Sequence, residues 1–362
     1  MCWSSARSFV KSAPAIDRME WIVQEVPELK GHTVEWAEPG NYYLSRRNRL
    51  YKSPDLKPPF AAVAAIDAPA WKSLAAHSRL GQRLLRFMVT NVRPLNNGDL
   101  FVTFDKAVGV IRSGRYIPLN GLMRPCRVLR SACAVDNNGD VYFGEYLANA
   151  ERGEMRVYKY SPGDDHLQAV YVFPPGSIKH IHGIYFDTAG DSLYCLTGDD
   201  ERECQILRTS DGFQTLEVVG QGDETWRAVS MLFDNEHIYY GTDAEFRSNH
   251  IYAAERDSFE RKILGEVNGT VFYSKRIGND LFFTTTAENA PAQKENVAAI
   301  WHVDAQGNCT ELIKFKKDRW HKALFQFGTI HFPAMSDEMD HLYFHLVGVE
   351  GDNHTFKLWP VA

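Results

Sequence analysis

Two histidines separated by one residue, His180 and His182, are the strongest chemical signal in this sequence of 362 residues. They open the stretch 179–200, which reads as two short strands joined by a Thr-Ala-Gly-Asp turn and ends in the acid pair Asp199-Asp200. Because side chains alternate along a strand, both imidazoles are expected on the same face. Near neutral pH, histidine serves as a general base or as a metal ligand.

The second half of this stretch belongs to a pattern that recurs along the chain. An acidic residue or asparagine, followed by large apolar residues rich in Tyr and Phe, begins at Asn41, Asp99, Asp140, Asp191, Glu236, Asp280 and Asp340. The spacing of about 40–60 residues falls in the range of propeller blades. Hairpin turns of Asn, Asp and Gly separate the apolar runs. Four antiparallel strands per unit, repeated seven times, predict an all-β fold, a seven-bladed β-propeller.

The repeat predicts a single propeller domain over residues 1–362. The last unit lacks a fourth strand, and we expect the alternating N-terminal segment 19–27 to supply it, which leaves no open sheet edge. Residues 69–86 show helical spacing and predict one inserted helix between blades one and two. This helix either caps one face of the ring or binds a membrane surface. The expected blades cover residues 32–67, 87–122, 130–174, 178–220, 226–267, 269–317 and 325–362.

Charge and cysteine content exclude several classes of protein. A net charge of −6 gives no global basic field, so nucleic-acid binding is disfavoured. No run of about 18 apolar residues is present to span a membrane. The six cysteines suggest neither a disulfide framework nor a zinc site. Residues 1–8 lack the apolar region of a secretory signal, so a cytoplasmic location is expected, although a signal removed earlier and the oligomeric state are not visible in the sequence.

In a propeller, the loops leading into first strands share one face with the loops between second and third strands, at the mouth of the central channel. These loops are rich in Arg, His, Tyr, Trp, Asp and Glu, whereas the opposite loops are mostly plain turns such as 137–139. The predicted catalytic residues on the rich face are His180, His182, Tyr146 and Glu145. The predicted substrate-binding residues are Arg127, Arg130, Arg227, Trp226, Asp199, Asp243, Asn249 and Gln326.

Each group has a chemical role and a structural alternative. His180 and His182 either contact the substrate or a metal, or only pack and hydrogen-bond between blades. The arginines either clamp a carboxylate or phosphate or form inter-blade salt bridges. Trp226 and Tyr146 either stack on a sugar ring or, for Trp226, fill the gap between blades. The acids Glu145, Asp199 and Asp243 suit acid/base work on a glycosidic bond, while the last two equally suit capping of tight turns.

The segment 208–216 resembles a degenerate Asp-box of the sialidase-type (BNR) repeat, Ser/Thr-x-Asp-x-Gly-x-x-Trp. Thr209 and Asp211 match, Gly212 stands one place early, and Leu216 replaces the Trp. The resemblance implies a propeller fold, a bias toward glycans and a purely structural role for Asp211. Seven units depart from the six blades of sialidases, and the sialidase arginine triad and nucleophilic Tyr are not matched here.

The residue types on the rich face are also similar to those of seven-bladed polysaccharide lyases that act on uronic acids. Those enzymes use His or Tyr as base and Arg, His or a metal to neutralise the carboxylate, and His180, His182, Tyr146 and Arg227 are of these types. We therefore predict a carbohydrate-active enzyme that cleaves an acidic glycan by hydrolysis or β-elimination. The alternative is a non-catalytic propeller that binds a glycan or protein partner. No cofactor is predicted; the alternative is a divalent metal on His180 and His182.

Overall fold

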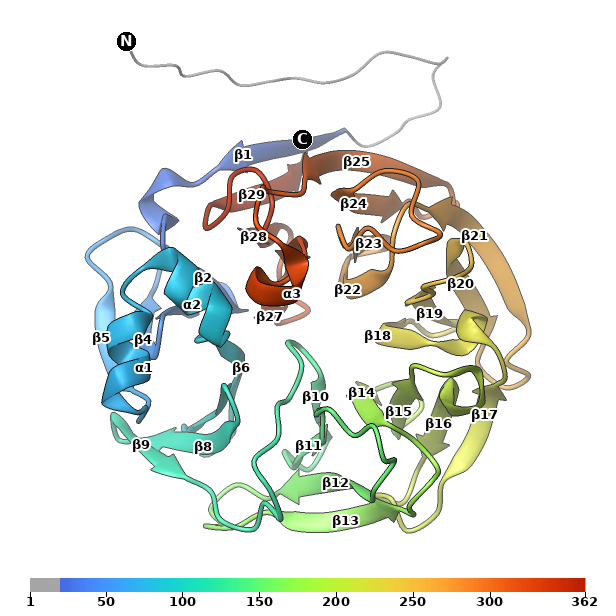
Figure 1. Ribbon diagram of the computed structural model, residues 1–362, viewed down its shortest axis with the longest axis horizontal. Coiled ribbons are helices and arrows are strands. Elements are labelled where there is room, and N and C mark those ends of the chain that lie inside the picture. Colours follow the sequence, from blue (N-terminus) through green and yellow to red (C-terminus); the bar gives the residue numbers. More distant parts are fainter. Residues whose placement is uncertain (1–19, 362) are drawn as a thin grey trace.

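The computed structural model describes residues 20–361, which form seven sheets arranged as a ring around a central channel (Figure 1). Cys2, the N-terminal segment 1–8 considered for a signal, residue 19 of the predicted closing strand and residue 362 of the last predicted blade lie outside the described residues. The fold is the predicted seven-bladed β-propeller. Within residues 20–361, no helix is long and apolar enough to cross a membrane.

The first three sheets are formed in chain order from the channel outward. The first contains β2 (Thr33–Ala37), β3 (Tyr42–Arg46), β4 (Arg49–Ser53) and β5 (Ala61–Ala65), with β27 (Ala334–Met335) added in parallel beside β2. The second contains β6 (Val89–Pro94), β7 (Leu100–Phe104), β8 (Ala107–Arg112) and β9 (Arg115–Pro118). The third contains β10 (Cys133–Val135), β11 (Val141–Gly144), β12 (Met155–Tyr160) and β13 (Gln168–Phe173).

The fourth to sixth sheets follow the same order. The fourth contains β14 (His180–Asp187), β15 (Ser192–Gly198), β16 (Gln205–Thr209) and β17 (Glu217–Gln221). The fifth contains β18 (Ala228–Phe233), β19 (His237–Thr242), β20 (Asn249–Glu255) and β21 (Arg261–Val267). The sixth contains β22 (Val271–Ile277), β23 (Asp280–Thr285), β24 (Val297–Val303) and β25 (Cys309–Lys316). Short 3-10 turns η1, η2 and η3 occupy Pro27–Leu29, Glu201–Glu203 and Glu224–Trp226.

The recurring Tyr- and Phe-rich pattern marks the second strand of every sheet. Its seven copies fall on β3, β7, β11, β15, β19, β23 and, in the seventh sheet, β28 (Leu342–Val347). These strands are buried on both faces because each sheet packs against two neighbours. That double burial explains why the pattern is continuous rather than alternating.

The N-terminal strand closes the ring as predicted. The seventh sheet runs β26 (Thr329–His331), β28, β29 (Thr355–Pro360) and β1 (Trp21–Glu25), so its outermost strand comes from the other end of the chain. β1 pairs antiparallel with β29, with Trp21 opposite Pro360. The Trp21 indole packs edge-on against Phe282 of the sixth sheet, with ring centroids 4.7 Å apart.

The insertion between blades one and two is confirmed, but it forms two short helices rather than one. α1 (Ala70–Ala75) ends before Ser78, whose hydroxyl accepts a hydrogen bond from Gly81 N and so starts α2 (Arg79–Leu85) as its N-cap. α2 is fastened by Arg83, which is 1% exposed and donates to Phe325 O and Asp318. Phe325 ends α3 (Lys322–Phe325), so the insertion contacts the segment before blade seven.

One glycine, Gly144, lets adjacent blades approach closely beside the histidine strand. A Cβ on Gly144, the last residue of β11, would lie 2.3 Å from Ile181 in the neighbouring blade. Ile181 is the residue between the two histidines, and its amide donates to Glu145 O at 3.0 Å. The close approach therefore fixes the start of β14, where both histidines stand.

Candidate active site at the channel mouth

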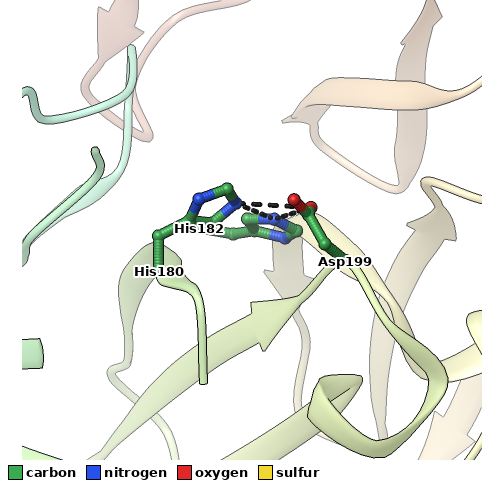
Figure 2. A group of neighbouring side chains, drawn as sticks. All are labelled: His180, His182 and Asp199. Carbon is green, nitrogen blue, oxygen red and sulfur yellow. Dashed lines mark hydrogen bonds and ion pairs between the residues drawn. The ribbon is translucent and has the colours of Figure 1, made fainter. Parts of the chain in front are cut away.

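The two histidines and Asp199 meet at one end of the β14–β15 hairpin (Figure 2). His180 pairs with Gly198, the last residue of β15, so Asp199 follows directly beside it. A register shift between Ile181 and Gly183 leaves His182 without an opposite residue on β15. The two imidazole Nε2 atoms lie 3.2 Å apart, and Asp199 Oδ1 lies 3.3 Å from Nε2 of His180 and 3.6 Å from that of His182.

The other ring nitrogens determine what the Nε2 atoms present. His182 Nδ1 lies 2.9 Å from Ala228 O, and His180 Nδ1 lies 3.4 Å from Leu147 O. A carbonyl oxygen only accepts hydrogen bonds, so each Nδ1 is the protonated nitrogen in the neutral ring. Both Nε2 atoms then direct lone pairs toward each other and toward the Asp199 carboxylate. Three electron-pair donors converge on one point, which a cation satisfies.

The spacing of these donors suits a divalent metal. Ligands about 2.1 Å from a tetrahedral centre are separated from one another by about 3.4 Å. The three observed separations, 3.2 to 3.6 Å, bracket that value. A backbone carbonyl behind each imidazole is the usual outer contact of metal-bound histidine. His180, His182 and Asp199 therefore fit the three-ligand set of an open metal site.

Two cations surround the third ligand. Arg227 Nη2 lies 3.0 Å from Asp199 Oδ1, and Lys179 Nζ lies 2.5 Å from its Oδ2. Burial raises the pKa of Asp199, but hydrogen bonds donated by the protonated forms of His180 and His182 and the charge of Arg227 outweigh it, so the pKa falls well below its ordinary value. Asp199 is therefore a carboxylate throughout the physiological pH range.

Arg227 joins this cluster to a second acid, Asp243. Its Nε lies 3.0 Å from Asp243 Oδ2, and the Asp243 amide donates to Arg227 O at 2.8 Å. Burial raises the pKa of Asp243 well above its ordinary value, against the effect of the Arg227 charge and with support from Glu288. Burial also raises the pKa of Glu288, which bonds to Thr270 and Thr286. One arginine thus compensates several buried acids.

The Tyr146 ring packs on the histidines from the neighbouring blade. Its centroid lies 4.3 Å from that of His180 and 6.4 Å from that of His182. Burial and the charges of Asp199 and Asp243 raise its pKa, so the phenol keeps its proton at neutral pH. Arg86, a residue after α2, lies close enough that its charge acts on Tyr146.

The structure gathers six of the predicted site residues: Tyr146, His180, His182, Asp199, Arg227 and Asp243. Glu145, although adjacent to Tyr146, is completely buried and pairs with Arg124 and the Tyr158 hydroxyl. Arg130 is also buried and pairs with Glu35 on β2. These contacts place Glu145 and Arg130 in structural ion pairs rather than in the cluster.

The remaining predicted residues lie around the cluster or outside it. Arg127 pairs its backbone with Tyr146 and its guanidinium with Asp105, so it stands at the edge. Trp226 faces the fifth sheet, where the Arg261 guanidinium covers its ring at 3.5 Å. Asn249 exchanges hydrogen bonds with Ala244 and holds the β19–β20 loop. Gln326 follows α3 as its C-cap, and its buried Oε1 has no hydrogen-bond donor among residues 20–361.

Sequence reasoning missed two contributors to the cluster, Lys179 and Arg86. Lys179 precedes the histidine strand, and its place beside Asp199 follows from the hairpin register, which a sequence signal could have indicated. Arg86 arrives from the inserted helices, and no periodicity links it to Tyr146. Glu288 follows β23, and no local pattern indicates its proximity to Arg227, which depends on the ring geometry.

The opposite side of the ring, which the sequence predicts to carry simple turns, also contains a cavity. A cavity of about 460 Å³ lies between the third and fourth sheets. It is lined by the turns that carry Asp136, Asp191 and Asp211. Asp211 accepts hydrogen bonds from Thr209 and Thr215 within its own turn, as the Asp-box resemblance implies.

Comparison with known proteins shows the fold and no family. No protein-family model and no curated protein matches the chain. An oligogalacturonate lyase in complex with manganese is similar in structure, with a TM-score of 0.60 and 7% identity, over 96% of this chain and 94% of that one. A chain of the mitotic checkpoint complex has a TM-score of 0.55 and 12% identity, over 99% of both chains.

A prolyl endopeptidase matches with a TM-score of 0.53 and 9% identity, over 88% of this chain. The match covers 46% of that chain, so this protein spans about half of its length. Proteins this distant share the propeller fold across unrelated activities. No BNR or sialidase relationship is found among these comparisons, and the fold alone does not select one function.

Proposed function

We propose that the channel mouth is the active site of a metal-dependent lyase that cleaves an acidic oligosaccharide by β-elimination. The observation that carries this proposal is the convergence of His180 Nε2, His182 Nε2 and Asp199 Oδ1 within 3.6 Å of one another. In this role the two histidines bind a divalent cation and do not transfer protons. When bound, such a cation would supply positive charge that acidifies the carbon beside a uronate carboxylate.

Arg227 and Lys179 orient the same carboxylate. Both already carry positive charge beside Asp199, at 3.0 and 2.5 Å, and Arg227 is mostly buried. A guanidinium in a site of low dielectric holds a carboxylate by charge-assisted hydrogen bonds. A uronic acid is thus the sugar class that these groups favour over a neutral one.

Tyr146 is the proton donor for the departing glycosidic oxygen. Its phenol remains protonated at neutral pH because burial raises its pKa. Its ring lies against His180, so its hydroxyl would lie beside a sugar bound at the cluster. Donation of this proton completes the cleavage of the carbon–oxygen bond, while a solvent water takes the proton from the carbon beside the carboxylate and returns it to the Tyr146 phenolate.

Hydrolysis by paired carboxylates is the less favoured reaction. That mechanism needs one acid free to donate a proton and one free to attack or activate water. Asp199 and Asp243 are instead both bound to Arg227, and the pKa of Asp199 is lowered. The raised pKa of Asp243 suits a proton donor, but this residue is only 4% exposed and its carboxyl faces the arginine. The structural likeness to an oligogalacturonate lyase that holds manganese supports elimination as the first reaction to test.

The test is incubation of the purified protein with oligogalacturonates, with and without Mn²⁺ after chelator treatment. Elimination creates a conjugated double bond, so ultraviolet absorbance rises, and product masses show no added water. His182→Ala should abolish the reaction, and His166→Ala, an exposed histidine beside Asp165, serves as the matched control. Products that contain an added water molecule would show that the reaction is hydrolysis and not elimination. Saturable binding without cleavage would support the non-catalytic glycan-binding alternative and overturn the proposed lyase activity.

A further inference from the structure

A second polar site lies where the ring closes, between blades one and seven and beside α2. It is a narrow cavity of about 20 Å³. Six of its lining side chains are basic or imidazole groups, and none of the residues lining it within 20–361 is Asp or Glu. The six are Arg46, Arg47, Arg79, Arg130, His331 and His345.

The charge around this cavity is only partly compensated. Arg79 forms two hydrogen bonds with Asp352, at 2.8 and 2.9 Å, and Arg130 pairs with Glu35. Arg47 donates to His77 O, and neither Arg46 nor Arg47 has a carboxylate partner in the described part of the chain. Four guanidinium groups therefore face two carboxylates, which leaves two positive charges, on the exposed Arg46 and the half-buried Arg47. An anion would balance this excess.

Within the described chain, two buried histidines each leave one ring nitrogen without a protein partner. Thr355 Oγ1 donates to His32 O and so accepts from His345 Nδ1, which leaves Nε2 of His345 as an acceptor for a water beside the anion. His331 is 7% exposed and His345 is 3% exposed. His331 Nε2 lies 2.9 Å from Thr329 Oγ1, and His345 Nδ1 lies 2.9 Å from Thr355 Oγ1. Their second nitrogens have no protein hydrogen-bond partner among residues 20–361. Burial, with the charges of Arg130 and Arg79, lowers the pKa of both, so the positive charge comes from the arginines.

We propose that this cavity binds a small inorganic anion of chloride size, which holds the ring closure together. The volume admits one or two water-sized species and excludes a sugar ring. An anion there would contact the β3–β4 hairpin of blade one, β26 and β28 of blade seven, α2, and Arg130 from the third blade. These parts come from both ends of the chain. The site is independent of the histidine–aspartate cluster and of the activity proposed for it.

The first experiment is thermal unfolding of the full chain while sodium chloride replaces sodium gluconate at constant ionic strength. Because a ligand that binds only the folded state stabilises it, Tm should rise and saturate, by about 2 °C. In the Arg46→Gln/Arg47→Gln double variant, the chloride concentration at half-saturation should increase about tenfold. Arg49→Gln is the matched control because Arg49 faces Arg46 across the same hairpin, is exposed, and does not line the cavity.

The second experiment locates the anion directly. Crystals grown in bromide should show an anomalous scattering peak in the cavity, and crystals of Arg46→Gln/Arg47→Gln should lack it. Water alone in the cavity would overturn the proposal. So would a Tm that responds equally to chloride and gluconate, or a chloride response that is unchanged in the double variant.

Discussion

Arg227 and Asp243 are joined twice, through an ion pair of 3.0 Å between their side chains and a hydrogen bond of 2.8 Å from the Asp243 amide to the Arg227 carbonyl. Asp243 is 4% exposed, and Arg227 also contacts Asp199 and Glu224. The arginine is therefore the counter-charge for the whole cluster. Its removal leaves buried acids without a partner.

Arg227→Met is expected to destabilise the protein by about 3–5 kcal/mol, the cost of breaking a buried ion pair from one side. The free energy of unfolding in urea measures this change. Arg208→Met is the control, because Arg208 pairs with Glu217 at the surface and should cost at most about 1 kcal/mol. Equal effects of the two substitutions would show that Arg227 is not the counter-charge described here.

Asp199→Asn should weaken Mn²⁺ binding by at least about 100-fold, because it removes a charged ligand and not only an outer contact. Isothermal titration calorimetry of the chelator-treated protein measures the affinity. Asp200→Asn is the matched control: Asp200 is the next residue, is exposed, and pairs with Arg152 instead. If Asp199→Asn binds Mn²⁺ as tightly as the wild type, the three-ligand site is wrong.

Tyr146→Phe should reduce kcat by about 100- to 10,000-fold, the usual range for loss of a proton donor, while the packing of the ring on His180 is kept. Steady-state kinetics on oligogalacturonate measures kcat and KM separately, and Mn²⁺ affinity should not change. Tyr171→Phe, on the outer strand β13, is the control. A rise in KM alone would assign Tyr146 to binding.

Asp211 should contribute to stability only above the acid range. Hydrogen bonds from Thr215 and Thr209 lower its pKa to about 2 from an ordinary value of 3.8. The folded state therefore favours the carboxylate, so the contribution is full above about pH 4 and is lost as pH falls toward 2. Unfolding curves of Asp211→Asn should approach those of the wild type across this window, with activity unaffected at neutral pH. A loss of activity would contradict the structural role.

Trp21→Ala should destabilise the ring by about 3 kcal/mol, because the indole packs on Phe282 of the adjoining blade. Its neighbour Ile22 is 40% exposed, and Ile22→Ala should cost much less. Chemical denaturation compares the two. Similar costs for both residues would mean that β1 contributes pairing but no inter-blade packing.

The sequence predicted the ring well because its evidence is repeated seven times. Each second strand is buried on both faces, which produces the same Tyr- and Phe-rich pattern in every blade. The break at Ser78 was missed, because apolar spacing continues from Leu74 to Leu80 across the N-cap. The parallel pairing of β27 beside β2 joins residues about 300 positions apart and leaves no local signal.

The candidate site was only partly predictable, for a related reason. Hairpin register places Asp199 beside His180, so that contact is readable from the strand pattern. Glu145 and Tyr146 are adjacent on a loop, yet the first pairs inward with Arg124 and the second turns to the histidines. Side-chain direction at the end of a strand depends on the neighbouring blade. The direction of these two side chains therefore cannot be predicted from the sequence.

The pairing of β1 with β29 also constrains the order in which the ring is completed. Ile22 lies opposite Trp359, so β1 waits for β29, which is synthesised later. At about 5–20 residues per second, that interval is roughly 20–70 s. Six blades can assemble during synthesis, while the seventh stays open until β29 has been made. The newly made protein therefore passes through an open-ring state with an unpaired strand edge, which is the stage most exposed to aggregation and to chaperone binding.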